Sequence, residues 1–135
     1  MANGGWYGTK EEWDRIEQPL LEIDTIINDF AKEFGLSVTK NHKDRPERSI
    51  QWGQEVRCLI QLYLASEDSL TFNLWFCASE DRGANRYWKN ETPVKGMKIA
   101  DFRNDLATLL REGRGKIDAW SKNNEELEFV TTFGE

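Results

Sequence analysis

Two cysteines and one histidine are the side chains best suited to metal binding or nucleophilic chemistry in this chain of 135 residues. Cys58 and Cys77 do not form a C-x-x-C pair, and a zinc site needs several clustered ligands, so we expect no metal site. His42 stands in a polar turn, where an exposed histidine is more common than a catalytic one oriented by a partner. The sequence therefore predicts no metal ion and no cofactor.

Signatures of nucleotide binding and of serine hydrolases are also absent. The sequence contains no G-x-S-x-G, no G-x-x-x-x-G-K-[ST] and no G-x-G-x-x-G after a strand. The Gly-Arg-Gly-Lys run at 113–116 has a composition that suits an anion, but it falls late in an apolar-striped helix, where we expect a break or bend. Because no nucleophile, base or metal set is recognisable, an enzyme is the last of the classes that we consider.

Six tryptophans are the most unusual feature of the composition. Trp13 and Trp120 fall on helical apolar stripes and are expected in the core, whereas Trp75 and Trp88 are candidates for exposure. Exposed aromatic residues beside arginines are typical of binding surfaces, because they bury a large area at low entropic cost. We therefore select as candidate binding residues Arg57, Leu59, Tyr63, Trp75, Arg86 and Trp88.

The charge balance is acidic, with 18 Lys and Arg against 24 Asp and Glu and a formal net charge of −6. Nucleic acid is not an expected partner, because non-specific binding to it needs a basic footprint. Acidic residues gather in 10–34, and basic residues gather in 40–57 and 80–103. These basic segments either carry scattered solubilising charge or meet an anionic ligand or acidic protein through Arg45, Arg48, Arg57, Arg82 and Arg86.

The sequence points to neither a membrane nor a secretory pathway. No apolar run is long enough for a transmembrane helix, and the N-terminus lacks a basic stretch followed by an apolar one. Two reduced thiols, rather than a disulfide framework, fit a cytoplasmic location. The length predicts a single α+β domain over 1–135, with 1–9 as a loose lead-in and 122–135 as a tail that adds a possible final strand.

Two helices are predicted from apolar residues at helical spacing. The first stripe runs through 10–34, where Thr9 and Glu12 have the spacing of a capping box. Pro19 either kinks this helix or splits it, and the continuous stripe favours a kink or a short break with the same face inward. The second helix is expected from about 99 to 120.

Strand signals fill the segment between the helices. The clearest alternation covers 55–64 and 70–78, and Pro93 with Gly96 marks a connection. Shorter strand signals lie at 36–39, 48–52 and 85–90. Connections between the strands are too short for parallel crossovers. The predicted fold is α+β, an antiparallel meander of four to six strands with an N-terminal and a C-terminal helix packed on one face.

Hydrophobic matching selects the faces of the two clearest strands. If 65–69 is their loop, Leu64 opposes Leu70 and Leu62 opposes Phe72, so that even-numbered residues point to the core. The opposite side of the sheet, which we call the odd face after the odd-numbered residues of these two strands, then carries Leu59, Tyr63 and Trp75, with Arg57 and Arg86 at its rim.

In this register Leu59 lies opposite Trp75 and Tyr63 lies opposite Thr71. Cys58 becomes a core residue and Cys77 lies on the odd face, so these two cannot form a disulfide. Residues 1–9 or the C-terminal segment are possible covers for the odd face.

The face of Trp52 depends on the turn that follows it. A two-residue turn at 53–54 places Ile50 and Trp52 on the odd face, whereas a three-residue loop at 53–55 places them in the core. Turn chemistry favours the first and apolar matching favours the second, and we prefer the core version.

Taken together, the sequence predicts a small soluble acidic protein that acts as a non-enzymatic protein-interaction module of adaptor, chaperone-like or immunity type. Its aromatic odd face would bind a protein partner or a second copy of the chain. The alternative is a small-ligand-binding domain with a pocket between the helices and the sheet.

Overall fold

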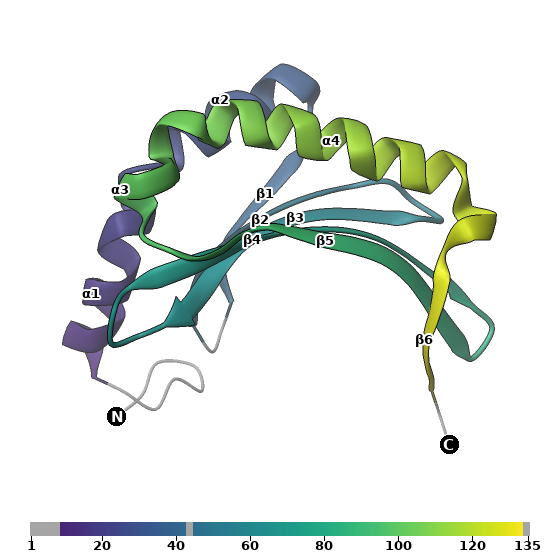
Figure 1. Ribbon diagram of the computed structural model, residues 1–135, viewed down its shortest axis with the longest axis horizontal. Coiled ribbons are helices and arrows are strands. Elements are labelled where there is room, and N and C mark those ends of the chain that lie inside the picture. The colour runs from purple at the N-terminus through teal and green to yellow at the C-terminus, as the bar shows by residue number, and fades with distance from the viewer. Residues whose placement is uncertain (1–8, 43–44, 134–135) are drawn as a thin grey trace.

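The computed structural model describes residues 9–42 and 45–133, which form one antiparallel meander with helices (Figure 1). The helices are α1 (Lys10–Leu21), α2 (Asp24–Phe34), α3 (Ile99–Phe102) and α4 (Leu106–Lys122), with short 3₁₀ turns η1 (Arg103–Asp105) and η2 (Asn124–Glu126). The strands are β1 (Ser37–His42), β2 (Arg45–Trp52), β3 (Arg57–Ser66), β4 (Thr71–Arg82), β5 (Asn85–Met97) and β6 (Glu128–Thr132). Each strand pairs antiparallel with the next, in the order β1-β2-β3-β4-β5-β6, so the sheet is open at both edges.

The first predicted helix is two helices that keep one face inward. Thr9 caps α1 in a reciprocal capping box with Glu12, as the spacing predicts. Pro19 lies inside α1, and the chain breaks after Leu21, where the backbone N–H of Ile23 bonds to the carbonyl of Leu20. The apolar stripe continues across this break because the residues on both sides of it are buried: Ile16, Leu20, Ile23, Ile27 and Phe30.

The second predicted helix also differs from the expectation. It is divided near its start into α3, η1 and α4, and α4 runs without interruption through Gly113 and Gly115. The expected break there is wrong, because Gly113 serves a close approach to the sheet. A Cβ atom at this position would lie 2.5 Å from the ring of Phe76.

The predicted faces of β3 and β4 are confirmed, but the predicted register is wrong by two residues. Leu64 pairs with Phe72 and Leu62 with Leu74. A bulge at the end of β3 and a turn with Leu70 at a φ of +50° displace the pairing. Because side chains alternate with a period of two, a shift of two residues leaves every residue on its face. Hydrophobic matching alone cannot separate these two registers.

The neighbouring strands correct two further details. Trp52 pairs with Cys58 and Ile50 pairs with Ile60. Ile50 and Trp52 therefore lie on the core side of β2, as we preferred, but the loop between β2 and β3 is longer than the expected 53–55. The expected connection at Pro93 and Gly96 is wrong, since β5 continues through both to Met97. The possible final strand exists as β6, which pairs with β5.

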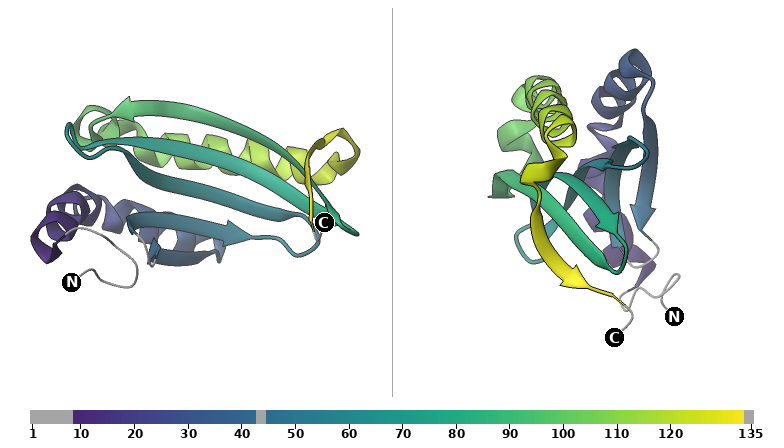
Figure 2. Two further views of the ribbon diagram at one scale, coloured as in Figure 1. Left: turned by 90° about the horizontal axis from the view of Figure 1, so that it is seen from below. Right: turned by 90° about the vertical axis from the view of Figure 1, so that its right-hand side faces the viewer.

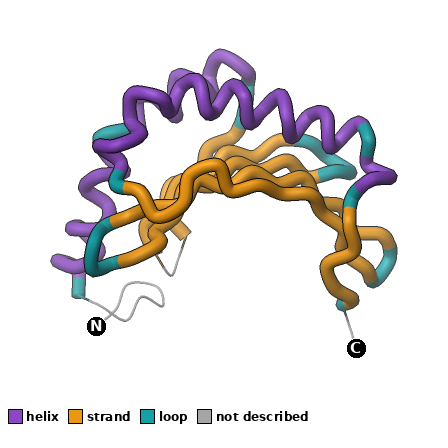
Figure 3. Tube along the Cα trace, in the orientation of Figure 1, coloured by secondary structure: helices purple, strands orange, loops and turns teal. Residues whose placement is uncertain are grey.

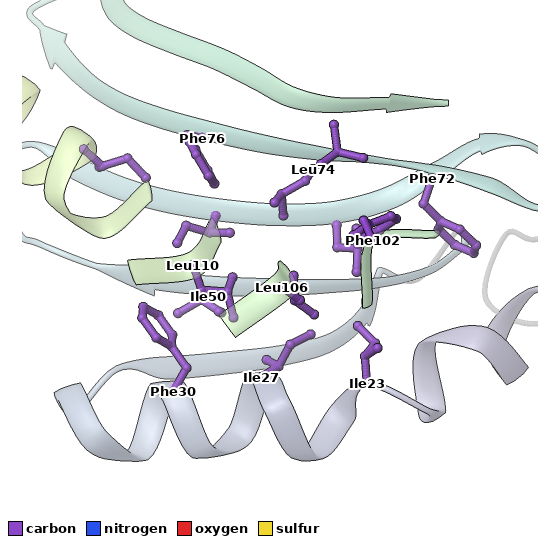
Figure 4. Close-up of a cluster of buried hydrophobic side chains, with 14 of the residues drawn as sticks. Ile23, Ile27, Phe30, Ile50, Phe72, Leu74, Phe76, Phe102, Leu106 and Leu110 are labelled. Carbon is purple, nitrogen blue, oxygen red and sulfur yellow. The ribbon is translucent and has the colours of Figure 1, made fainter. Parts of the chain in front are cut away.

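One core joins the helices to the even-numbered side of the sheet (Figure 4). Figure 4 shows Ile27 and Phe30 from α2 and Leu106 and Leu110 from α4 turned toward Ile50 and the side chains of β4. Figures 1 and 3 show α2 and α4 over the same side of the sheet, with the strands bending away from them at both ends. Register shifts in the β4–β5 pairing, on either side of Leu74, accompany this bend. The odd face is therefore concave, and the view from below in Figure 2 shows the strands in front of α4.

Candidate binding pocket on the odd face

A pocket of about 650 Å³ opens on the concave odd face, and we call it the concave pocket. Its lining residues come from the five strands β1 to β5 and from the turn between β2 and β3, so only the folded sheet assembles it. Five of the six candidate binding residues line it, namely Arg57, Leu59, Trp75, Arg86 and Trp88. It is completed by Ser37, Gln51, Trp52, Gly53, Gln54, Cys58, Cys77 and Ser79.

The strand register explains why residues far apart in sequence meet here. Two rows of paired residues run across the strands on the odd face. The first row is Ser37, Gln51, Leu59 and Cys77 on β1 to β4. The second row is Arg57, Ser79 and Trp88 on β3 to β5. The first row makes an apolar floor of Leu59 and Cys77 with a polar rim at its β1–β2 end.

Two tryptophans form an aromatic wall beside this floor. The rings of Trp75 and Trp88 meet edge to face, with centroids 5.5 Å apart and an interplanar angle of 71°. The indole N–H of Trp75 donates to Oδ1 of Asn90 at 3.1 Å, which fixes the orientation of its ring. Both rings are half-buried, so the wall keeps aromatic surface available to a ligand.

Two arginines of the lining form the charged end of the pocket, and both bind Asp81 beside it. Nη2 of Arg57 donates to Oδ2 of Asp81 at 2.9 Å, and Nε of Arg86 donates to Oδ1 at 2.9 Å. The hydrogen bond from Arg86 holds the pKa of the Asp81 carboxyl below its usual value, and the same bond raises the pKa of Arg86. With two guanidinium groups and one carboxylate, this cluster carries a formal net charge of +1.

The thiols that line the pocket are poor nucleophiles. Cys77 is 3% exposed, and burial raises its pKa to about 12. Burial likewise raises the pKa of Cys58 to about 11. A thiol held in its protonated form does not attack or bind a metal readily. Cys77 therefore acts as part of the apolar floor.

This raised pKa predicts a specific pH dependence of stability. In the unfolded chain the thiol ionises near its ordinary pKa of 9.0, whereas Cys77 in the folded protein stays protonated. The unfolded state alone then releases a proton, so stability falls as the pH rises above about 9. Chemical denaturation at a series of pH values should show wild type losing stability relative to Cys77→Ala between about pH 9 and 11. A constant difference between the two proteins would contradict this.

The turn before β3 contributes Gly53 and Gln54 to the rim of the pocket. Gly53 has a φ of +88°, and a Cβ atom there would clash with the carbonyl oxygen of Val56, so the turn requires glycine. The indole N–H of Trp52 donates to Oδ1 of Asp118 on α4 at 2.8 Å. This bond ties the rim of the pocket to the helix on the other side of the sheet.

The structure separates the remaining candidate, Tyr63, from the pocket. Tyr63 lies further along the odd face, where its hydroxyl accepts a bond from Nδ2 of Asn73 at 3.3 Å. Trp75 pairs with Gln61 and Leu59 pairs with Cys77, which corrects the predicted Leu59–Trp75 contact across the strands. Tyr63 pairs with Asn73, where Thr71 was expected. Sequence reasoning missed Gln51 and Ser37: Gln51 follows from parity once the pairing of β2 with β3 is known, and Ser37 follows once β1 is paired with β2.

The five arginines proposed to meet an anionic ligand or acidic protein do not form one patch. Arg48 is fully buried and holds Asp24 and Glu17, so the hypothesis that it meets an external anion is wrong. Arg45 pairs with Glu47 and Arg82 pairs with Glu80. The concave pocket is lined by the other two, Arg57 and Arg86.

The predictions for Trp120, Trp13 and His42 are confirmed only in part. Trp120 packs against the core, and Trp13 is half-buried in α1. His42 is exposed, but it ends β1 where a loop was expected. Residues 1–8, expected as a lead-in and a possible cover of the odd face, lie outside the described residues.

Neither the described residues nor the comparisons with known proteins assign a metal site or a known activity to this pocket. Among residues 9–42 and 45–133, no group of three or more His, Cys, Asp or Glu side chains is placed to hold a metal ion. In the same part of the chain, each helix is too short or too polar to cross a bilayer. No family model, curated protein or solved structure matches this chain. The geometry of the concave pocket is thus the basis for a functional proposal.

Proposed function

We propose that this protein is a non-enzymatic interaction module that binds a segment of a protein partner in the concave pocket of its odd face. The observation that carries the proposal is the pair of contacting indoles, Trp75 and Trp88, beside an open apolar floor. Tryptophan and arginine are the residue types most enriched among the side chains that dominate binding energy at interfaces. The pocket presents both types on a rigid sheet.

The distribution of the core supports the same proposal. The helices bury the even-numbered side of the sheet, so they act as a scaffold that leaves the odd face for a partner. Cys58 and Cys77 are free thiols, which supports a reducing compartment such as the cytoplasm as the proposed location. Pocket thiols with raised pKa values favour binding over covalent catalysis.

A small-molecule ligand is the second candidate function. The volume of about 650 Å³ falls within the range of about 300–1,000 Å³ typical of ligand pockets. This pocket lies on the face opposite the one that the sequence suggested, since the core side chains fill the space between helices and sheet.

Site-specific photocrosslinking tests the proposal directly. A benzoylphenylalanine placed at Leu59, on the pocket floor, should capture the occupant in living cells, whereas the same group at Glu112 on the exposed side of α4 should not. The captured protein would then be purified and its affinity measured. Equal capture from both positions would refute the pocket as the binding site.

Substitutions in the wall supply the quantitative test. Trp88→Ala and Trp75→Ala should each weaken the purified complex at least tenfold, because they remove aromatic area from its centre. Phe129→Ala is a matched control, since Phe129 is a 57% exposed aromatic residue outside the pocket lining. If both tryptophan variants bind as tightly as the control, the odd face is not the interface.

A further inference from the structure

The charged end of the concave pocket has hydrogen-bond donors that its own aspartate does not use. Asp81 accepts from Nη2 of Arg57 and from Nε and Nη2 of Arg86. In the described part of the chain, Nη1 of neither arginine has an acceptor. A guanidinium presents five N–H groups in a fixed plane, and only some of them reach Asp81. These donors belong to partly exposed side chains, so an incoming acceptor can reach them.

The apolar groups lie close enough to be used by the same ligand. Trp88 belongs to the same row of paired residues as Arg57, and both line one pocket with Leu59. The ring of Phe133 lies 4.7 Å from the guanidinium carbon of Arg86 and covers one face of it, which leaves the edge of the guanidinium for an in-plane acceptor. The pocket thus places a cationic edge beside an aromatic wall.

We propose that the partner segment carries an aspartate or glutamate side chain next to a large apolar residue. The carboxylate binds Nη1 of Arg57 and of Arg86, and the apolar side chain lies on Leu59 against the two indoles. This inference rests on the proposed function, because it names the chemistry of the segment that the concave pocket binds. Planar carboxylates match the guanidinium fork, and such charge-assisted bonds are about twice as strong as neutral ones.

The charges of the pocket and of the whole protein favour a short acidic segment over a basic segment or a polyanion. A basic segment would meet a cluster with a net charge of +1, in which Asp81 is the one acidic group and is already paired with both arginines. A polyanion such as a nucleic acid would be repelled by a protein with a net charge of −6. A short segment with one carboxylate uses the local attraction and presents little charge to the rest of the surface.

A random dodecapeptide library, selected on the purified protein, is the probe for this inference. Parallel selections use Trp88→Ala, which alters the wall, and the double variant Arg57→Gln with Arg86→Gln, which removes the charge. Thermal unfolding of each variant confirms that it is folded before it is used. Arg103→Gln is the matched control, because Arg103 is an exposed arginine paired with Glu22 at 3.1 Å, outside the pocket lining.

The expected result is enrichment of Asp or Glu beside Leu, Ile, Phe or Trp on wild type and on Arg103→Gln, and its loss on the double variant. Enrichment that needs Trp88 but shows no acidic preference would overturn the inference and leave the proposed function standing. Peptides that bind wild type and Trp88→Ala alike, or no enriched peptides at all, would overturn both.

A double-mutant cycle on a selected peptide tests the contact itself. Replacing its acidic residue with the corresponding amide should weaken binding to wild type about tenfold. The same replacement should have little effect on binding to Arg86→Gln, because the carboxylate has then lost its donor. An equal loss on both proteins would show that the carboxylate does not contact Arg86, which would overturn the inference.

Discussion

Replacing Arg48 with methionine is expected to lower the free energy of unfolding by about 3 kcal/mol, because it leaves two partly buried carboxylates without their cation. The Arg48 side chain is fully buried, and its Nε lies 2.6 Å from Oδ1 of Asp24. Its Nη2 lies 3.4 Å from Glu17, so one guanidinium joins β2 to both α1 and α2. In a domain of this size the loss corresponds to a fall of about 10 °C in the melting temperature.

The buried cluster has enough polar partners to account for this effect. Nη1 of Arg48 donates to Oδ1 of Asn41 at 2.8 Å and to the carbonyl of Glu47 at 3.0 Å. After the substitution, Asp24 keeps Lys40 at 3.4 Å, but that pair is half exposed and contributes little. Differential scanning calorimetry and urea denaturation would measure the loss.

Two further variants distinguish a buried counterion from ordinary packing. Arg103→Met removes an exposed ion pair with Glu22 and should change stability by less than about 1 kcal/mol. Adding Asp24→Asn and Glu17→Gln to Arg48→Met should recover part of the loss, because no carboxylate then lacks a cation. A stability of Arg48→Met within about 1 kcal/mol of wild type would refute this account.

Two glycines of α4 should respond to alanine with opposite signs. Gly113→Ala is expected to lower the free energy of unfolding by about 1–3 kcal/mol, because its Cβ would lie 2.5 Å from ring carbons of the buried Phe76. Gly115→Ala is expected to raise it by about 0.5–1 kcal/mol, because nothing lies within 4 Å of its Cβ and alanine favours the helix.

The pair forms its own control, since both substitutions are the same change in one helix. Urea denaturation of both variants measures the two signs. Combining Gly113→Ala with Phe76→Leu should cost less than the sum of the two single changes, because the smaller side chain makes room for the new methyl group. If Gly113→Ala stabilised the protein as Gly115→Ala does, α4 would not approach the sheet as closely as the structure shows.

The features of the fold that follow from a repeating sequence pattern were predictable. The features that depend on a single contact between residues far apart in the sequence were not. Alternation along β3 and β4 fixes which side chains face the core, but it repeats every two residues and so permits the register that proved wrong. Gly113 looks like a helix breaker in the sequence, because nothing local shows that Phe76 lies against it. The continuation of β5 through Pro93 likewise depends on its neighbours in the sheet.

The candidate site was also predictable only in part. Parity identified Arg57 and Trp75 as odd-face residues, composition identified Trp88 as a candidate for exposure, and the structure places all three on one pocket. Arg48 has the same residue type and lies in the same basic segment as Arg57, yet it is buried under α1 and α2. Distinguishing the two requires knowing that the carboxylates of Asp24 and Glu17 reach β2, which sequence spacing does not show.

The contact between the indoles of Trp75 and Trp88 has a spectroscopic consequence. At a centroid separation of 5.5 Å, the electronic transitions of the two chromophores couple, so the pair should contribute an exciton couplet to the far-ultraviolet circular dichroism. Replacing either indole with phenylalanine would abolish that couplet, which assigns it among the six tryptophans of the chain. An occupant that rotates one ring against the other would change its amplitude, so the pocket carries a label-free reporter for ligand screening.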